Sequence, residues 1–214
     1  GTYLKEEVAA EAVVRNLPAF SRFLTVAALC NGQMLNYSKI ASDAQVPKTT
    51  VQEYFHILRD TLIGDDLPAW RRTEKRKPLT TAKFYFFDIG IVRHLQRRRH
   101  LQEGSPEFGE AFEAYLHHEL KTYCDYEGVM ELAYWRSTSD FEVDFILNDR
   151  TAIEVKAKRH VSDRDLRGLR ALQEERLLKH YIVVSQEASP RRVDGIDILP
   201  WRDFLDRLWD GAYS

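Results

Sequence analysis

The sequence contains very little cysteine, no long apolar run and no low-complexity tract. Its 214 residues include only two cysteines, Cys30 and Cys124. Because they lie in separate apolar-periodic segments, they argue against a disulfide framework or a zinc site. The longest apolar stretches fall far short of the roughly 18 residues that a membrane span requires. These absences predict a cytoplasmic protein that makes no contact with a membrane.

Charge is nearly balanced overall but unevenly distributed. The formal net charge is −2. Residues 1–104 hold 16 basic and 11 acidic side chains, whereas residues 105–214 hold 15 and 22. Such asymmetry suggests separate roles, with the basic half better suited to phosphates and the acidic half to cations. A polar stretch with Gly and Pro at 97–106 predicts the boundary between two domains, 1–104 and 105–214.

The first half contains a helix-turn-helix pattern. A buried helix is predicted at 20–29, and a short helix opens at 36–41. Pro47 starts a second helix, at the position where its missing N–H costs nothing. Three apolar side chains share one face of this second helix: Val51, Phe55 and Leu58. A loop with a basic tip and a strand at 83–88 follow, so the pattern predicts a winged helix.

Two interpretations of this domain remain open. As a DNA-binding module, it would place the second helix in the major groove and the basic wing on phosphates. The candidate contact residues are Lys48, Thr49, Gln52, Arg71, Arg72, Lys75, Arg76 and Lys77. As a protein-interaction module, it would need no strongly basic surface, and the second helix also carries Glu53 and Asp60.

The second half begins with a helix whose start is well marked. Ser105 is the expected N-cap and Pro106 the first helical residue. An apolar ridge follows, formed by Phe108, Phe112, Leu116 and Leu120. Glu113 lies at the flank of this ridge, where a carboxylate either faces solvent or points into a cleft against the element on which the helix packs.

Three strand-like runs come next, and the last two form a predicted hairpin. The runs cover residues 129–136, 141–147 and 151–157. A three-residue loop at 148–150 places Leu147 opposite Thr151, and the same register places Asp144 opposite Glu154. Strict alternation then assigns one face to Val143, Phe145, Leu147, Ile153, Val155 and Ala157. It assigns the other face to Glu142, Asp144, Ile146, Ala152, Glu154 and Lys156.

The second of these faces predicts a metal site. Directly opposed Cβ atoms lie only about 4.5–5.5 Å apart, so Asp144 and Glu154 would repel each other. A hard cation such as Mg²⁺ or Mn²⁺ would convert that repulsion into coordination. Lys156 would add positive charge where a phosphodiester transition state accumulates negative charge. The alternative is a solvated face on which Lys156 pairs with Glu142. Apolar residues on the same face favour partial cover by a helix, and a covered charge needs an ion or a function.

The remaining sequence predicts helices packed on a mixed sheet. A capping box at 162–165 starts a helix that carries Leu166, Leu169, Leu172 and Leu177. The continuous apolar run 181–184 indicates a buried parallel strand. A short strand at 196–199 and a helix at 201–208 complete the chain. The expected fold class of the second half is therefore mixed α/β.

This order of elements resembles the PD-(D/E)XK nuclease superfamily, which includes restriction endonucleases and archaeal Holliday-junction resolvases. The resemblance rests on Asp144 in the second strand, Glu154-Val155-Lys156 in the third and Glu113 in the first helix. It implies a restriction-endonuclease-like αβββαβ domain. It also implies Mg²⁺ binding by Asp144 and Glu154, completion of the site by Glu113, and a Lys156 that positions or activates the attacking water.

A more specific resemblance covers nearly the whole chain. The segments 109–113, 134–137, 142–145 and 153–156 resemble the C-terminal region of a family of bacterial and archaeal AAA-type ATPases, in which an ATPase module precedes a winged helix and a nuclease-like domain. This chain has no G-x-x-x-x-G-K-[ST] motif, so we expect the ATPase module to be missing from it. The first residues lack an initiator methionine and a secretory signal, as expected for a piece of a longer protein.

Three hypotheses follow from the sequence. The first is a Mg²⁺-dependent endonuclease or resolvase that acts on duplex or branched DNA. The second is a DNA-binding module with a silent nuclease fold, since the Pro-Asp dipeptide that names the superfamily is absent before Asp144. The third is a protein-interaction region that couples an ATPase to a partner. The oligomeric state stays open, a homo-oligomer included.

Overall fold

The computed structural model of the chain describes residues 16–98, 100–128 and 130–213. It forms two compact units. The first comprises Gly1–Asp66 and Ala82–Leu101, and the second comprises Leu67–Thr81 and Gln102–Ser214. The sequence predicted a single division between residues 104 and 105. The structure adds a segment from the middle of the first half, Leu67–Thr81, to the second unit.

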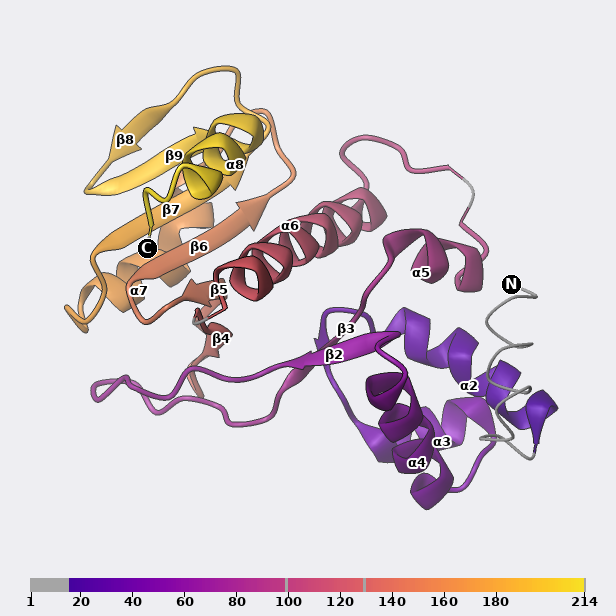
Figure 1. The fold of residues 1–214 in the computed structure, drawn as a ribbon. Coiled ribbons are helices and arrows are strands. Elements are labelled where there is room, and N and C mark those ends of the chain that lie inside the picture. Colours follow the sequence, from indigo (N-terminus) through magenta and orange to yellow (C-terminus); the bar gives the residue numbers. More distant parts are fainter. Residues whose placement is uncertain (1–15, 99, 129, 214) are drawn as a thin grey trace. The chain divides into compact units, whose positions relative to one another are not determined.

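Helices packed on a small sheet make up the first unit (Figure 1). Its helices are α2 (Leu17–Leu29), α3 (Tyr37–Ala44), α4 (Lys48–Asp60) and α5 (Ile89–Leu95). Its strands are β1 (Gln33–Met34), β2 (Gly64–Leu67) and β3 (Lys83–Phe86), in the order β1-β3-β2, and the last residue of β2 already belongs to the second unit. The predicted helices are confirmed, although Pro47 is the N-cap of α4 rather than its first residue.

Aromatic side chains hold these helices against the sheet. The Phe55 ring of α4 lies 4.9 Å from that of Phe23 in α2 and 5.0 Å from that of Phe84 in β3, both in edge-to-face contact. Gln45 ends α3 in the left-handed conformation and turns the chain into α4. The predicted apolar face of α4 is buried as expected: Val51, Phe55 and Leu58.

A six-stranded mixed sheet forms the centre of the second unit. Its strands are β4 (Leu132–Arg136), β5 (Glu142–Leu147), β6 (Thr151–Lys156), β7 (His180–Ser185), β8 (Arg191–Val193) and β9 (Ile196–Pro200), in the order β4-β5-β6-β7-β9-β8. The pairs β4–β5, β5–β6 and β8–β9 are antiparallel, and β6–β7 and β7–β9 are parallel. The predicted mixed α/β class and the parallel setting of 181–184 are thus confirmed.

Helices cover both faces of this sheet (Figure 1). They are α6 (Pro106–Glu127), the 3₁₀ helix η1 (Asp163–Leu166), α7 (Arg167–Gln173) and α8 (Trp201–Trp209). On one face, Leu166, Leu169 and Leu172 of η1 and α7 join a core cluster with strand residues. On the other face, His117 of α6 lies 6.0 Å from the ring of Phe145. No helix in the described ranges is long and apolar enough to cross a membrane.

Both predicted helix starts are confirmed, but the helix after the capping box is shorter than expected. The Ser105 hydroxyl caps α6 by accepting from the N–H of Phe108 at 3.1 Å. The capping box at Ser162 opens η1, which continues as α7 only to Gln173. Leu177 therefore lies beyond α7, and it is 44% exposed. The prediction that Leu177 extends the apolar face of this helix is wrong, because the helix ends a full turn earlier.

The predicted hairpin register is confirmed for the three pairs nearest the loop, but the ladder ends before the predicted pair of Asp144 and Glu154. Leu147 pairs with Thr151, and Phe145 pairs with Ile153. The intervening loop is tight because Asn148 and Asp149 adopt φ values of 50° and 54°. Asn and Asp tolerate this left-handed conformation better than other side chains do. Local turn chemistry therefore fixes which residues of β5 and β6 face each other.

The predicted alternation of faces along β5 fails at a β-bulge. Ala133 of β4 pairs with Ile146, whereas Trp135 pairs with Val143. Two steps along β4 therefore match three along β5, which carries one extra residue. As a result, Val143 lies in the same core cluster as Ile146, below α7, and not on the face of Phe145. The bulge re-aims the residues between them, one of which is Asp144.

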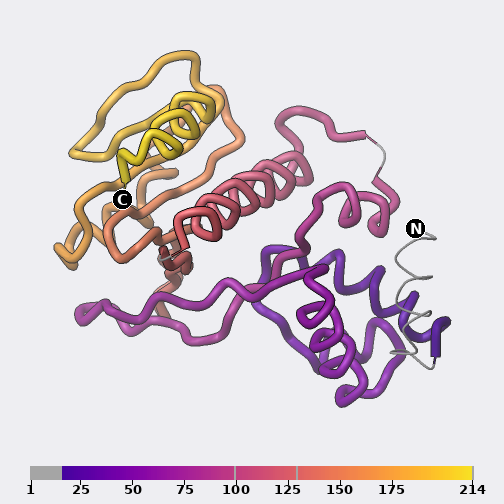
Figure 2. Tube along the Cα trace, in the orientation of Figure 1, coloured from indigo at the N-terminus to yellow at the C-terminus, as the bar shows by residue number. Residues whose placement is uncertain are grey.

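Leu67–Thr81, called the arm below, pairs with the edge of β4. The N–H of Trp70 donates to the carbonyl of Tyr134 at 2.7 Å, and the N–H of Leu79 donates to that of Arg136 at 2.8 Å. The indole of Trp70 donates to Asp149 at 2.6 Å. Figure 2 shows the arm as one long excursion of the chain between β2 and β3. It protects backbone groups that an edge strand would otherwise expose.

Glu175 anchors the tip of the arm. Its carboxylate accepts hydrogen bonds from three successive backbone N–H groups, those of Glu74, Lys75 and Arg76, at 3.0–3.1 Å. The side chain of Glu175 is only 2% exposed. Successive N–H groups that converge in this way form a concave site for an anion, and here the anion is a carboxylate of the same unit.

We expect Glu175→Ala to lower the free energy of unfolding by about 2 to 4 kcal/mol, because three N–H donors lose a charged acceptor. Urea unfolding followed by tryptophan fluorescence measures this, since Trp70, Trp135, Trp201 and Trp209 all belong to the second unit. The matched control is Glu174→Ala, whose more exposed side chain pairs with Arg76, and we expect it to cost less than about 1 kcal/mol. Equal losses in the two variants would contradict the prediction.

Candidate active site

Asp144 lies where β5 and β6 separate. Regular pairing of the two strands ends at Phe145 and Ile153. Beyond that pair, Oδ2 of Asp144 accepts a hydrogen bond from the N–H of Val155 at 2.8 Å. A side chain thus replaces a backbone acceptor at this point in the ladder. Asp144 is 7% exposed, and the bulge together with this hydrogen bond fixes its carboxylate beside β6.

Glu154 and Lys156 form an ion pair along β6. Nζ of Lys156 donates to Oε1 of Glu154 at 2.5 Å. The other oxygen, Oε2 of Glu154, is buried and has no hydrogen-bond partner among the described residues. In the alternative that left this face solvated, Lys156 paired with Glu142. The structure pairs Lys156 with Glu154, and Glu142 with Arg136 at 3.4 Å.

Opposing electrostatic effects act on this group: burial and Asp144 disfavour the charged form of Glu154, whereas the neighbouring carboxylates favour the charged form of Lys156. Burial, and next the charge of Asp144, raise the pKa of Glu154 from 4.5 to about 8, although Lys156 acts against both. Burial alone would lower the pKa of Lys156, but the carboxylates of Glu154, Asp144 and Glu113 raise it above its ordinary value. Glu113 of α6 is the weakest of the charges acting on Glu154.

The fit of this group to a metal ion is partial. Within the described residues, no group of three or more His, Cys, Asp or Glu side chains is arranged to hold a metal ion. Two features nevertheless suit a hard cation, which takes oxygen ligands. Glu154 has a buried oxygen without a partner, and Asp144 lies close enough to raise its pKa. The predicted ligands Asp144 and Glu154 therefore come together. Glu113, the third predicted ligand, has the weakest electrostatic effect on the pKa of Glu154.

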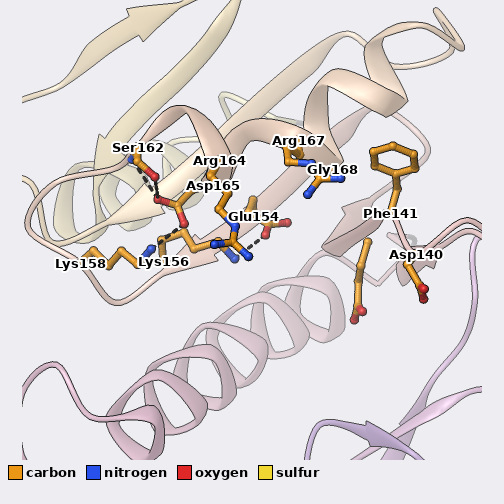
Figure 3. Close-up of a pocket in the computed structure, with 11 residues that line it drawn as sticks. Asp140, Phe141, Glu154, Lys156, Lys158, Ser162, Arg164, Asp165, Arg167 and Gly168 are labelled. Carbon is orange, nitrogen blue, oxygen red and sulfur yellow. Dashed lines mark hydrogen bonds and ion pairs between the residues drawn. The ribbon is translucent and has the colours of Figure 1, made fainter.

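A cavity of about 380 Å³ opens beside the Glu154–Lys156 pair (Figure 3). The start of β5, the end of β6, η1 and the first turn of α7 line it. Arg164 and Arg167 are lining residues that the sequence analysis did not identify. The available signal was the run of basic residues between positions 158 and 167. Periodicity alone does not reveal that a 3₁₀ turn brings these side chains over the end of β6.

The predicted nucleic-acid-binding residues fall into two groups. On α4 of the first unit, Lys48, Thr49 and Gln52 are exposed, as expected. In the arm, four basic side chains have partners within the second unit: Arg71 with the Thr80 carbonyl, Arg72 with Asp149, Lys75 with the Glu174 carbonyl, and Arg76 with Glu174. The remaining arm residue, Lys77, contributes a backbone carbonyl that accepts from Thr138. The arm thus differs from a wing whose basic tip projects freely.

Comparison with protein families matches both halves of the chain. Residues 108–204 match the model described as "Domain of unknown function (DUF4143)", a domain found at the C-termini of AAA-ATPase-associated proteins. Residues 1–102 match the model described as "Domain of unknown function (DUF8612)". No curated protein and no solved structure matches the chain.

Proposed function

We propose that the second unit hydrolyses phosphodiester bonds of DNA in a Mg²⁺-dependent reaction, on a restriction-endonuclease-like fold of the PD-(D/E)XK type. The observation that carries this proposal is the grouping of Asp144, Glu154 and Lys156 where β5 and β6 separate. The order α6-β4-β5-β6-α7-β7 supports it, because the proposed acids and lysine lie on the second and third strands of that order.

Each residue of the group has a role that its surroundings suit. Asp144 and Glu154 would hold Mg²⁺ or Mn²⁺, with Glu113 as the third carboxylate. The ion, when bound, supplies charge stabilisation and lowers the pKa of a coordinated water. Lys156 remains protonated because the surrounding carboxylates raise its pKa, so it offers a fixed positive charge to a phosphate. The N–H of Val155 holds Asp144 in place independently of any ion.

Cleavage of duplex, branched and single-stranded DNA with Mg²⁺ or Mn²⁺ tests this proposal. We expect Asp144→Ala and Lys156→Ala each to lower the rate by at least about 100-fold, the usual effect of removing a group that stabilises developing charge. The control is Lys121→Ala, which removes an exposed lysine paired with Asp125 on α6 and should leave the rate unchanged. Equal cleavage by the wild type and both active-site variants would point to a contaminating nuclease and overturn the proposal.

A second candidate is a DNA-binding module in which the nuclease fold is silent. The exposed polar face of α4 favours it, and we infer that the first unit is a winged helix whose arm is committed to the second unit. DNA binding without cleavage supports this candidate. If the protein neither binds nor cleaves DNA, the result instead supports a cytoplasmic protein-interaction region. The matched domain occurs in AAA-ATPase-associated proteins, which supports a role beside an ATPase module for a DNA-binding or a protein-interaction region alike.

A further inference from the structure

We propose that Arg164 and Arg167 form a phosphate-binding subsite beside the Glu154–Lys156 pair. The subsite takes a second phosphate of the nucleic-acid strand, either the neighbouring phosphodiester or a terminal phosphate. It rests on the nucleic-acid substrate of the proposed function, but it does not require that the chain cut that substrate. Nucleotide-sized ligands fit the cavity, since small-molecule sites typically measure about 300–1,000 Å³.

Both arginines line the cavity that also contains Glu154 and Lys156. They are three residues apart, Arg164 within η1 and Arg167 at the start of α7, so they emerge on the same side of this turn. Figure 3 shows their side chains around one cavity with Glu154, Lys156 and Phe141. A strand bound at Lys156 would therefore pass the two guanidinium groups.

Each carboxylate that lines the cavity is paired with a cation, and Asp140 and Glu142 share Arg136. Arg136 pairs with Asp140 at 3.2 Å and with Glu142 at 3.4 Å. Lys156 pairs with Glu154 at 2.5 Å, and Lys158 with Asp165 at 2.6 Å. These pairs account for every carboxylate that lines the cavity. Arg164 and Arg167 are the two lining cations that take no part in these pairs.

Arg164 and Arg167 keep their N–H donors available. Both side chains are exposed, and in the part of the chain that the structure describes neither has a hydrogen-bond or ion-pair partner. A guanidinium presents its donors in a planar fork that matches two oxygens of a phosphate. Two such forks on one side of a cavity suit a phosphate better than they suit a neutral ligand.

Phe141 holds Arg167 in place without using those donors. The guanidinium carbon of Arg167 lies 5.8 Å from the centre of the Phe141 ring, and that of Arg76 lies 5.1 Å from it. Arg76 is already committed to Glu174 at 2.7 Å and to the Ala171 carbonyl at 3.0 Å. The ring thus contacts one guanidinium that already donates to two protein acceptors and one, that of Arg167, that donates to none among the described residues.

Binding of a labelled oligonucleotide in EDTA tests the subsite separately from cleavage. The probe is an oligothymidylate of about 12 nucleotides, within the usual range of single-strand site sizes, with fluorescein at its 3′ end. We expect the double variant Arg164→Gln/Arg167→Gln to raise the Kd by about tenfold or more, as for lost charge-assisted hydrogen bonds. The slope of log Kd against log salt should fall by about 0.7 for the phosphate released.

Two further variants separate recognition from net charge. Arg202→Gln/Arg207→Gln on α8 removes the same charge from a helix that lies outside the cavity, and it should leave the Kd within about twofold. Arg164→Lys/Arg167→Lys keeps the charge but removes the forks, so an intermediate Kd is expected. Urea unfolding confirms that each variant is folded.

Probes with a 5′-phosphate and with a 5′-hydroxyl distinguish whether the subsite binds a terminal phosphate or an internal phosphodiester. Tighter binding of the phosphorylated probe that disappears in Arg164→Gln/Arg167→Gln assigns a terminal phosphate, and equal binding by the wild type assigns an internal phosphodiester. An unchanged Kd in Arg164→Gln/Arg167→Gln, or no binding by the wild type, overturns the subsite. Arginine-dependent binding without any metal-dependent cleavage overturns the nuclease proposal alone. Cleavage that needs Lys156 but not the two arginines overturns the subsite alone.

Discussion

Gly168→Ala is expected to lower the free energy of unfolding of the second unit by about 3 kcal/mol, at the upper end for an overpacked site. A Cβ at this position would lie 1.9 Å from the carbonyl oxygen of Glu142 and 3.3 Å from a methyl carbon of Val143. The oxygen is a backbone atom of β5, so it cannot rotate away as the end of a side chain could. The first turn of α7 would have to move off the sheet.

The matched control is Gly109→Ala in α6. A Cβ there meets nothing within 4 Å, and alanine is the better helix former by about 1 kcal/mol. The same chemical change should therefore stabilise α6 and destabilise the packing of α7. Urea unfolding monitored by tryptophan fluorescence gives both values. Shifts of the two variants in the same direction would show that the close approach of α7 to β5 is not rigid.

Glu154→Gln is expected to stabilise the protein increasingly as pH rises. The folded-state pKa of Glu154 is raised from 4.5 to about 8, by burial first and by Asp144 second. The stability that its neutral form contributes is fully present below its ordinary pKa and is lost as pH rises through the folded value. The glutamine variant has no such loss. Its advantage should be near zero at about pH 5 and on the order of 2 to 4 kcal/mol at about pH 8.5.

Unfolding curves measured at several pH values test this prediction. Asp144→Asn provides the comparison, because the amide oxygen can still accept from Val155 while the charge that raises the pKa of Glu154 is gone. Its stability should fall less steeply with pH than that of the wild type. A constant difference between Glu154→Gln and the wild type across this range would contradict the prediction, because it would mean that folding does not raise the pKa of Glu154.

The parts of the fold that local chemistry controls were predictable from the sequence. Ser105 and Ser162 mark helix starts because each side chain or capping box satisfies backbone N–H groups that the helix itself leaves unpaired. The register of β5 and β6 follows from the length of the loop that joins Leu147 to Thr151. That register predicts Asp144 beside Glu154, but the bulge in β5 and the hydrogen bond from Val155 decide where the Asp144 carboxylate lies.

The differences arise where distant residues or single insertions decide the structure. One extra residue in β5 moves Val143 to the other face, and an alternating apolar pattern contains no sign of it. The two-residue strand β1 and the three-residue strand β8 are too short for a periodic signal. The basic segment 75–77 has the composition of an exposed wing tip. Its partners, Glu174 and Glu175, are about a hundred positions away, and no local pattern connects them.

The candidate site shows the same division. Asp144, Glu154 and Lys156 were identified because period and register bring them together. Arg164 and Arg167 were missed because their position depends on how the 3₁₀ turn η1 sits over the end of β6, which is a matter of tertiary packing. The approach of Gly168 to Glu142 is part of that packing, since it sets how near the turn lies to the sheet.

The arm also constrains how such a protein can be inherited. Because the chain enters the second unit at Leu67, leaves it after Thr81 and re-enters at Gln102, a single crossover that transfers the whole second unit also transfers Ala82–Leu101 of the first unit. A recombinant that acquired only the residues after Gln102 would lack the partner of β4 and the three N–H groups that surround Glu175. A folded second unit therefore requires the arm and the residues from Gln102 onward to be inherited together.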